Sequence, residues 1–284
     1  MDKAIIIGAF EFIGFNLTKH LLDEGIEVDG IHTDTENEGF FVNGKRLEIG
    51  RNANFKEIEF EDWMRSKDVS EHQTVTVISL YDYFINHRES LLFSDHGLCD
   101  KLQKILSYHA RTVLLLPAQY YFQKGFTDFE KTAGSDLSTL LKEEDPALLK
   151  IYLPTVYGPW QSPASLFQQC FLKELDPAYS IPENDHREWT DDAIYVDAVV
   201  ETIGILINQT IAGSFLLANE ETGHWHKCAE LLGIDNAIDR NIQTKKLHDK
   251  NDIEVQKVKM SITAREGIKK QKEHLENSLL FEND

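Results

Sequence analysis

The segment between residues 4 and 31 constrains the fold more than any other part of the chain. Ala4–Ile7 is a short, wholly apolar run that ends at Gly8, as in strands buried on both faces of a parallel sheet. Apolar residues then recur at helical spacing between Phe15 and Leu22, and Gly25 ends that pattern. Ile26–Ile31 follows as a second strand. Strand, glycine turn, helix, glycine and strand in this order predict a βαβ unit.

The same alternation continues along the chain. Three more strand-like runs are Thr74–Ser79, Thr112–Leu116 and Leu148–Leu153, and helical patterns occupy Leu91–Tyr108 and Phe129–Glu143. Alternating strands and helices predict an α/β fold with a Rossmann-type, doubly wound parallel sheet. Prolines become frequent from residue 154 onward. We therefore predict an NAD(P)-binding domain over 1–153 and a smaller substrate-binding lobe over 154–284, interleaved with the first.

The composition of the chain limits the kinds of partner that it can bind. The chain of 284 residues carries a net charge of −19, which repels both nucleic acid and anionic membrane surfaces. No run approaches the ~20 apolar residues that cross a bilayer, and the N-terminal apolar run is too short for a signal peptide. The three cysteines, Cys99, Cys170 and Cys228, lie far apart, which favours a reducing compartment. A cytoplasmic protein that binds a small molecule is expected.

The glycine turn carries a family resemblance. Gly8-Ala-Phe-Glu11-Phe-Ile-Gly14 resembles the GxxGxxG fingerprint of the extended short-chain dehydrogenases/reductases, the NAD-dependent epimerase/dehydratase family. Further segments are similar to that family in the same order: Pro154–Pro159, Arg187–Trp189 with Ala193–Asp197, Gly213–Asn219, Ala229–Gly233 and Ser261–Ile268. The resemblance spans nearly the whole chain and implies a nucleotide-binding cleft.

The catalytic residues of the family are missing from their expected positions. The resemblance implies a Ser/Thr–Tyr–Lys set, with Tyr as acid/base and Lys lowering its pKa. Phe129 and Ala133 occupy the Tyr and Lys positions, and Gln119 lies at the end of the fifth strand, where Ser or Thr is expected. One alternative is a displaced pair, Tyr120 and Lys124, on the loop after the fifth strand.

The predicted cofactor site is also altered. At the middle glycine position Glu11 brings both bulk and charge to the place where a pyrophosphate lies against backbone N–H groups. The alternative is that Glu11 turns outward or caps its own helix. His32 replaces the residue that contacts the adenosine ribose, so the sequence does not distinguish NAD from NADP as the cofactor. Glu11 is expected to weaken the binding of both. The full set of cofactor positions implied by the resemblance is Gly8, Glu11, Phe12, Ile13, Gly14, His32, Asp62, Trp63, Ser79, Leu80 and Pro154.

The resemblance also implies substrate contacts and an assembly. Tyr157, Arg187 and Tyr195 match substrate-binding positions, although each also fits a purely structural role. The helical patterns at Leu91–Tyr108 and Phe129–Glu143 match the pair that forms the family's dimer interface, so a homodimer is expected. His224, His226 and Cys228 alternate, but this segment reads as the start of a helix, where alternate residues diverge. No metal site is predicted.

Two functions follow from these observations. The first is a degenerate member of the family that keeps the fold, has lost redox catalysis, and acts as a binding, regulatory or accessory protein. The second is an active NAD(P)-dependent nucleotide-sugar epimerase/dehydratase or reductase that uses displaced residues. The missing catalytic set and Glu11 favour the first.

Overall fold

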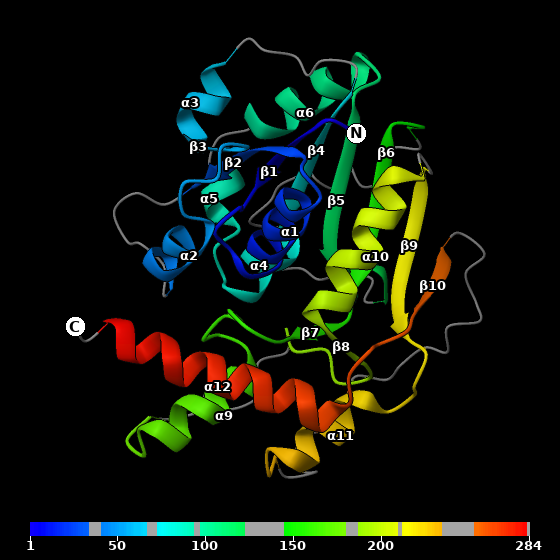
Figure 1. The fold of residues 1–284 in the computed structure, drawn as a ribbon. Helices are drawn as coiled ribbons and strands as arrows, with labels where there is room; N and C mark the ends of the chain where they lie inside the picture. The colour runs from blue at the N-terminus through cyan, green and yellow to red at the C-terminus, as the bar shows by residue number, and fades with distance from the viewer. Residues whose placement is uncertain are drawn as a thin grey trace.

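A parallel sheet of eight strands forms the centre of the molecule (Figure 1). The computed structural model describes residues 1–33, 41–66, 73–93, 97–122, 145–179, 187–209, 212–234 and 253–282. The strand order is β10-β9-β6-β5-β4-β1-β2-β3. The strands are β1 (Lys3–Ile7), β2 (Glu27–His32), β3 (Phe55–Glu59), β4 (Thr74–Ser79), β5 (Arg111–Pro117), β6 (Leu148–Leu153), β9 (Gly213–Asn219) and β10 (Glu254–Val258). The predicted Rossmann-type fold is confirmed.

The helices cover the sheet and extend beyond its carboxyl edge. They are α1 (Phe12–Asp23), α2 (Val42–Ile49), α3 (Phe60–Arg65), α4 (Leu80–Ile85), α5 (Ser90–Phe93), α6 (Gly97–Ser107), α7 (Gln119–Phe122), α9 (Leu166–Leu175), α10 (Val196–Asn208), α11 (His224–Leu231) and α12 (Ala264–Glu282). Helices α1 and α10 pack against each other on one face. Because the crossovers from β1 to β2 and from β4 to β5 run in opposite directions, the right-handed rule places α1 and α6 on opposite faces.

The predicted βαβ unit depends on two glycines, one at a close approach and one in a left-handed turn. A Cβ at Gly14 would lie 2.0 Å from the Gly8 carbonyl oxygen, so only glycine lets α1 start this near the end of β1. Gly25 ends the helix in a left-handed conformation, with φ of 79°. Strands β4 and β6 have the predicted bounds, and each is buried along its whole length. This burial explains why their sequences are apolar runs rather than alternating patterns.

The C-terminal half contributes to two parts of the structure. Strands β9 and β10 extend the large sheet beyond β6, in parallel register. A separate two-stranded sheet of β7 (Thr155–Tyr157) and β8 (Ala193–Tyr195) lies with α9, α11 and α12 below the carboxyl edge of the large sheet (Figure 1). Residues 154–284 therefore supply strands to the main sheet as well as this lower layer.

The order of the strands reverses between β1 and β4. The chain moves to one side from β1 through β2 to β3, and to the other side from β4 through β5 to β6. At such a switch point the loops that follow the strands diverge and leave a crevice at the carboxyl edge. None of the described helices is long and apolar enough to cross a membrane.

Candidate ligand site at the carboxyl edge of the sheet

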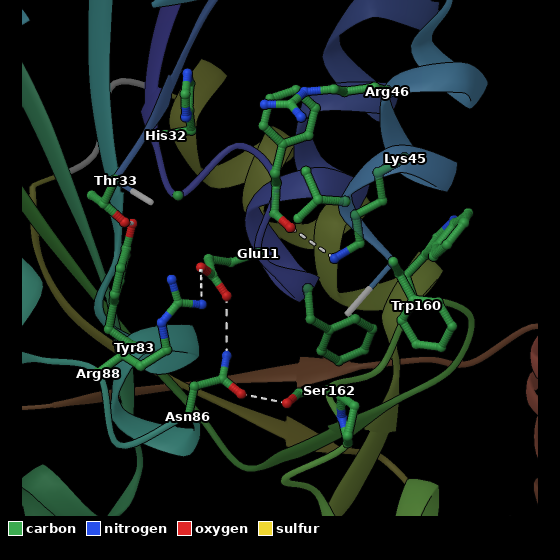
Figure 2. Close-up of a pocket in the computed structure, with 16 residues that line it drawn as sticks. Glu11, His32, Thr33, Lys45, Arg46, Tyr83, Asn86, Arg88, Trp160 and Ser162 are labelled. Atoms are coloured by element: carbon green, nitrogen blue, oxygen red, sulfur yellow. Dashed lines mark hydrogen bonds and ion pairs between the residues drawn. The ribbon is translucent and has the colours of Figure 1, made fainter. Parts of the chain in front are cut away.

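A cavity of about 140 Å³ lies at the switch point, beyond the ends of β1, β2 and β4 (Figure 2). Its walls come from the glycine turn, from α2, from α4 and the turn after it, and from the loop after β7. The lining residues are Gly8, Phe10, Glu11, Phe12, His32, Thr33, Phe41, Val42, Lys45, Arg46, Tyr83, Asn86, Arg88, Trp160, Ser162 and Pro163. Four of the predicted cofactor residues, Gly8, Glu11, Phe12 and His32, are thus brought together here.

An internal carboxylate occupies the first backbone N–H groups of α1. Asp82, on α4, accepts hydrogen bonds from the N–H of Ile13 at 2.9 and 3.0 Å and from the N–H of Gly14 at 3.0 Å. Ser79 Oγ donates a further bond of 2.6 Å. Burial raises the pKa of Asp82 to about 7, and the hydrogen bond from Ile13 opposes that rise most strongly. A carboxyl group of the chain therefore already occupies the helix terminus that attracts anions, and it is charged above a pH of about 7.

Glu11 points into the cavity rather than capping its helix. Its side chain makes no capping hydrogen bond. Instead, its two carboxylate oxygens accept hydrogen bonds from Arg88 at 3.1 Å and from Asn86 at 3.0 Å (Figure 2). Asn86 Oδ1 in turn accepts a bond from Ser162. Glu11 is thus fixed in the cleft by a chain of polar contacts that joins α4 to the loop after β7.

Two cations reach the cavity from α2. Lys45 is 4 % exposed, and its Nζ donates to the Phe10 carbonyl oxygen at 2.8 Å. Burial lowers the pKa of Lys45 to about 8, against the opposing charges of Glu11 and Asp82. Arg46 covers the Phe10 ring at 5.3 Å and pairs with Glu57 at 2.8 Å.

The wall beside Lys45 is aromatic and carries backbone strain. Phe41 and Trp160 meet edge to face, with ring centroids 5.3 Å apart. Both have positive φ, 75° and 68° respectively, a conformation that costs a bulky residue on the order of 1–2 kcal/mol. Trp160 is held by a 2.7 Å hydrogen bond from its Nε1 to Glu48. A Cβ at Gly44 would lie 2.7 Å from the Trp160 ring, so glycine is needed there.

The other predicted cofactor residues lie outside the cavity. Asp62 is exposed on α3, and Trp63 is buried there beneath Lys101, which lies 4.6 Å from its ring. Ser79 and Leu80 are buried where β4 meets α4. Pro154 is buried between β6 and β7.

The predicted substrate residues are engaged within the protein. Tyr157 is fully buried against Tyr195, and its hydroxyl lies 2.9 Å from His224 Nε2. Arg187 pairs with Glu89 at 2.6 Å and also donates to the Phe84 carbonyl oxygen. Tyr157 and Tyr195 thus pack within the lower layer, whereas Arg187 joins that layer to α4 and the turn after it.

The predicted catalytic positions fall largely outside the described residues. Lys124, Phe129 and Ala133 lie there, as does the whole of the helical pattern Phe129–Glu143. The expectation of a loop directly after β5 is wrong, because Gln119–Phe122 forms the short helix α7. Gln119 is buried and donates to the Arg187 carbonyl oxygen at 2.6 Å, and Tyr120 packs on Phe84.

Sequence reasoning missed most of the polar residues around the cavity. Helix α2 was not predicted, because Val42–Ile49 has no apolar stripe. Lys45 and Arg46, which lie on this helix, were therefore not among the predicted site residues. Asp82 follows Ser79 by three residues at the start of α4, a spacing that suggests a local cap. Ser79 does donate to Asp82, but the backbone partners of Asp82 lie 68 and 69 residues away, beyond the reach of any local pattern.

Three alternating residues near the start of α11 form no metal site in the described structure. His224 is buried and hydrogen-bonded to Tyr157, and helix α11 begins at that residue, as predicted. Within the described ranges, no group of three or more His, Cys, Asp or Glu side chains is placed to hold a metal ion.

The strand order, the glycine turn and the cleft at the switch point define the class of fold. This chain has the fold of the NAD-dependent epimerases and dehydratases, the extended short-chain dehydrogenases/reductases. It is similar over 97 % of its length, and over 99 % of the other chain, to UDP-glucuronic acid 4-epimerase from Bacillus cereus in complex with NAD. The TM-score is 0.65 and the sequence identity 14 %.

Two other solved structures have a similar relation to this chain. One is TunA, an NAD-dependent NDP-hexosamine 5,6-dehydratase involved in tunicamycin biosynthesis, with a TM-score of 0.63, 15 % identity and 98 % of each chain covered. The other is dTDP-glucose 4,6-dehydratase from Bacillus anthracis in complex with NAD, with a TM-score of 0.60 and 15 % identity over 98 % of this chain and 97 % of that one. No family model matches the sequence.

A curated relative matches a short part of the sequence. The uncharacterized protein YjaV of Bacillus subtilis (strain 168) is 34 % identical over 61 residues, which are 21 % of this chain. The match spans 33 % of that relative.

Proposed function

We propose that this chain is a ligand-binding protein on an epimerase/dehydratase fold that has given up nicotinamide redox chemistry. The observation that carries the proposal is the carboxylate of Asp82 on the N–H groups of Ile13 and Gly14. Those N–H groups cannot serve a pyrophosphate while they serve Asp82. A binding, regulatory or accessory role is what the remaining cavity supports.

The negative charge at the start of α1 and the size of the cavity both oppose a dinucleotide. Glu11 and Asp82 place two carboxylates beside the start of α1. Like charges at ~4 Å repel by about 1 kcal/mol in water and about 4 kcal/mol in a partly screened site. A cavity of about 140 Å³ is also small beside the roughly 300–1,000 Å³ of ordinary cofactor and drug sites. The residues present therefore do not fit NAD or NADP in the phosphate position.

The loss of catalysis rests on the family positions. Gln119 has no hydroxyl to bond a substrate oxygen, and Phe129 and Ala133 carry no proton to transfer. The alternative is an active nucleotide-sugar epimerase/dehydratase or reductase that uses Tyr120 and Lys124. A nucleotide-sugar substrate is suggested by the Bacillus cereus UDP-glucuronic acid 4-epimerase, which is also known in complex with UDP-glucuronic acid and NAD.

Calorimetric titration with NAD and NADP tests the proposal. We expect no measurable binding to the wild type, a gain in Glu11→Gly, and a larger gain in the double variant Glu11→Gly, Asp82→Ala. Removing ~1–4 kcal/mol of repulsion at Glu11 corresponds to roughly five- to a thousandfold in affinity. Glu61→Gly, at an exposed acidic position in the first turn of α3, is the matched control and should change nothing.

Two results would contradict the proposal. One is tight NAD binding by the wild type that neither substitution changes. The other is cofactor-dependent turnover of a UDP-, GDP- or dTDP-sugar that Tyr120→Phe abolishes, which would establish the displaced catalytic pair instead.

A further inference from the structure

The cavity concentrates positive charge in an acidic protein. Among its lining residues, Lys45, Arg46 and Arg88 are cations and Glu11 is the one carboxylate. The whole chain, by contrast, carries a net charge of −19. Arg88 is balanced by Glu11 and Arg46 by Glu57, whereas Lys45 is hydrogen-bonded to a neutral carbonyl oxygen. A local excess of cations in a concave, partly apolar site favours an anion.

Lys45 is the buried centre of this charge. Only 4 % of the residue is exposed, and it lies 5.6 Å from the Phe15 ring and 6.0 Å from the Trp160 ring. An ammonium has three donors, and the hydrogen bond recorded within the described residues uses one of them, to Phe10. Burying a lysine against aromatic rings is costly, and an incoming carboxylate or phosphate would offset that cost.

The aromatic wall sets the size of the ligand. Phe41 and Trp160 face the cavity, and their strained backbone conformations are of the kind that clusters at ligand sites. The cavity volume of about 140 Å³ is close to the ~150 Å³ of an apolar protein cavity that binds benzene. The space therefore suits one six-membered ring with a small charged group.

We propose that this cavity binds a small organic anion whose apolar body is about one six-membered ring, with the anionic group on Lys45 and the ring against Trp160 and Phe41. This assignment rests on the proposed function, since a dinucleotide would fill the same space. Carboxylates and phosphate monoesters both have the required chemistry.

Benzoate and phenyl phosphate are suitable probes, one for each kind of anionic group. Titrated calorimetrically into the full chain, at least one should bind, and the neutral isostere benzamide should bind at least about tenfold more weakly. Inorganic phosphate, which lacks the ring, should also bind at least about tenfold more weakly. Lys45→Met keeps the length of the side chain and should weaken the binding anion about tenfold or more. Lys104→Met, on the exposed side of α6, is the matched control and should leave the affinity unchanged.

Three outcomes would overturn the inference: no binding of either anion at about 10 mM, equal affinities for benzoate and benzamide, or full affinity in a folded Lys45→Met. A parallel titration with NAD separates this inference from the proposed function. If NAD binds the wild type tightly and displaces the aromatic anion, the proposed function fails while the anion site stands.

Discussion

At the scale of single residues, two carboxylates distinguish this cleft from an open dinucleotide site. Glu11 is held by Arg88 and Asn86, and Asp82 is held by the backbone of α1 and by Ser79. Both are therefore fixed by the fold rather than free to swing aside. A helix N-terminus favours a negative charge, and here a side chain supplies that charge from within the chain.

Lys45→Met should stabilise the protein at neutral pH. The pKa of Lys45 falls from 10.5 to about 8 on folding because the ammonium is buried. Between those values the unfolded chain binds more protons, so the stability of the wild type should rise with pH, by at most about 1.4 kcal/mol per pH unit. Glu11, Asp82, Glu48, Arg88 and His274 face Lys45. Of these, Asp82, with a pKa of about 7, and His274, with a pKa of about 4, titrate below this window.

Urea unfolding of the wild type and Lys45→Met at pH 7 and pH 9.5 measures this effect. The free energy of unfolding of the variant should exceed that of the wild type at pH 7, and the gap should narrow at the higher pH. A gap that is independent of pH would mean that Lys45 is not buried as a charge. A lysine that costs stability and is nevertheless present agrees with a role in binding.

At the scale of elements, a network of glutamines joins α12 to the layer below the sheet. Gln271 is 1 % exposed, and its Nε2 donates to Gln161 at 2.6 Å and to Gln168, on α9, at 2.8 Å. Its Oε1 accepts a 3.0 Å bond from the Gly158 N–H. The network therefore holds the loop that carries Trp160 and, with it, one wall of the cavity.

Gln271→Met should destabilise the protein by at least about 3 kcal/mol. The substitution keeps the side-chain volume but leaves buried polar groups on Gln161, Gln168 and Gly158 without partners, each costing on the order of 1–3 kcal/mol. Urea unfolding measures the change, with Gln103→Met on the exposed face of α6 as the control. A loss below about 0.5 kcal/mol would show that water or repacking replaces the network.

At the scale of the whole molecule, charge opposes self-association. Each chain carries a net charge of −19, so two copies repel at low salt. The apolar side chains of α6, Leu98, Leu102, Ile105 and Leu106, are already buried within the chain. An interface there would rest on the polar side of α6 and on residues 129–143, which lie outside the described part.

We propose that the chain forms a homodimer that strengthens with ionic strength. Raising salt from roughly 0.05 to 0.5 M shortens the screening length to a few ångströms and removes most of the repulsion between the two acidic copies. Sedimentation velocity at micromolar concentration should show the dimer fraction increasing over this range. A monomer at every salt concentration would contradict the proposal.

The sequence by itself determined the parallel sheet and its glycine turn. Apolar runs such as Thr74–Ser79 and Leu148–Leu153 are local patterns. A strand that is buried on both faces needs apolar side chains at nearly every position, so such a run identifies it. The need for glycine at position 14 could also be predicted from the sequence, because Gly14 and Gly8, which approach each other closely, belong to the same short motif.

The tertiary structure alone decided what the cleft contains. Asp82 meets Ile13 across 69 residues, and Arg88 meets Glu11 across 77. Lys45 comes from a helix without an apolar stripe, and the aromatic wall pairs Phe41 with Trp160. Periodicity reports only which face of an element is buried, whereas these contacts depend on how the loops beyond the sheet turn back over its edge. The fold could therefore be predicted from local patterns, whereas the residues that meet in the cleft could be identified only from the tertiary structure.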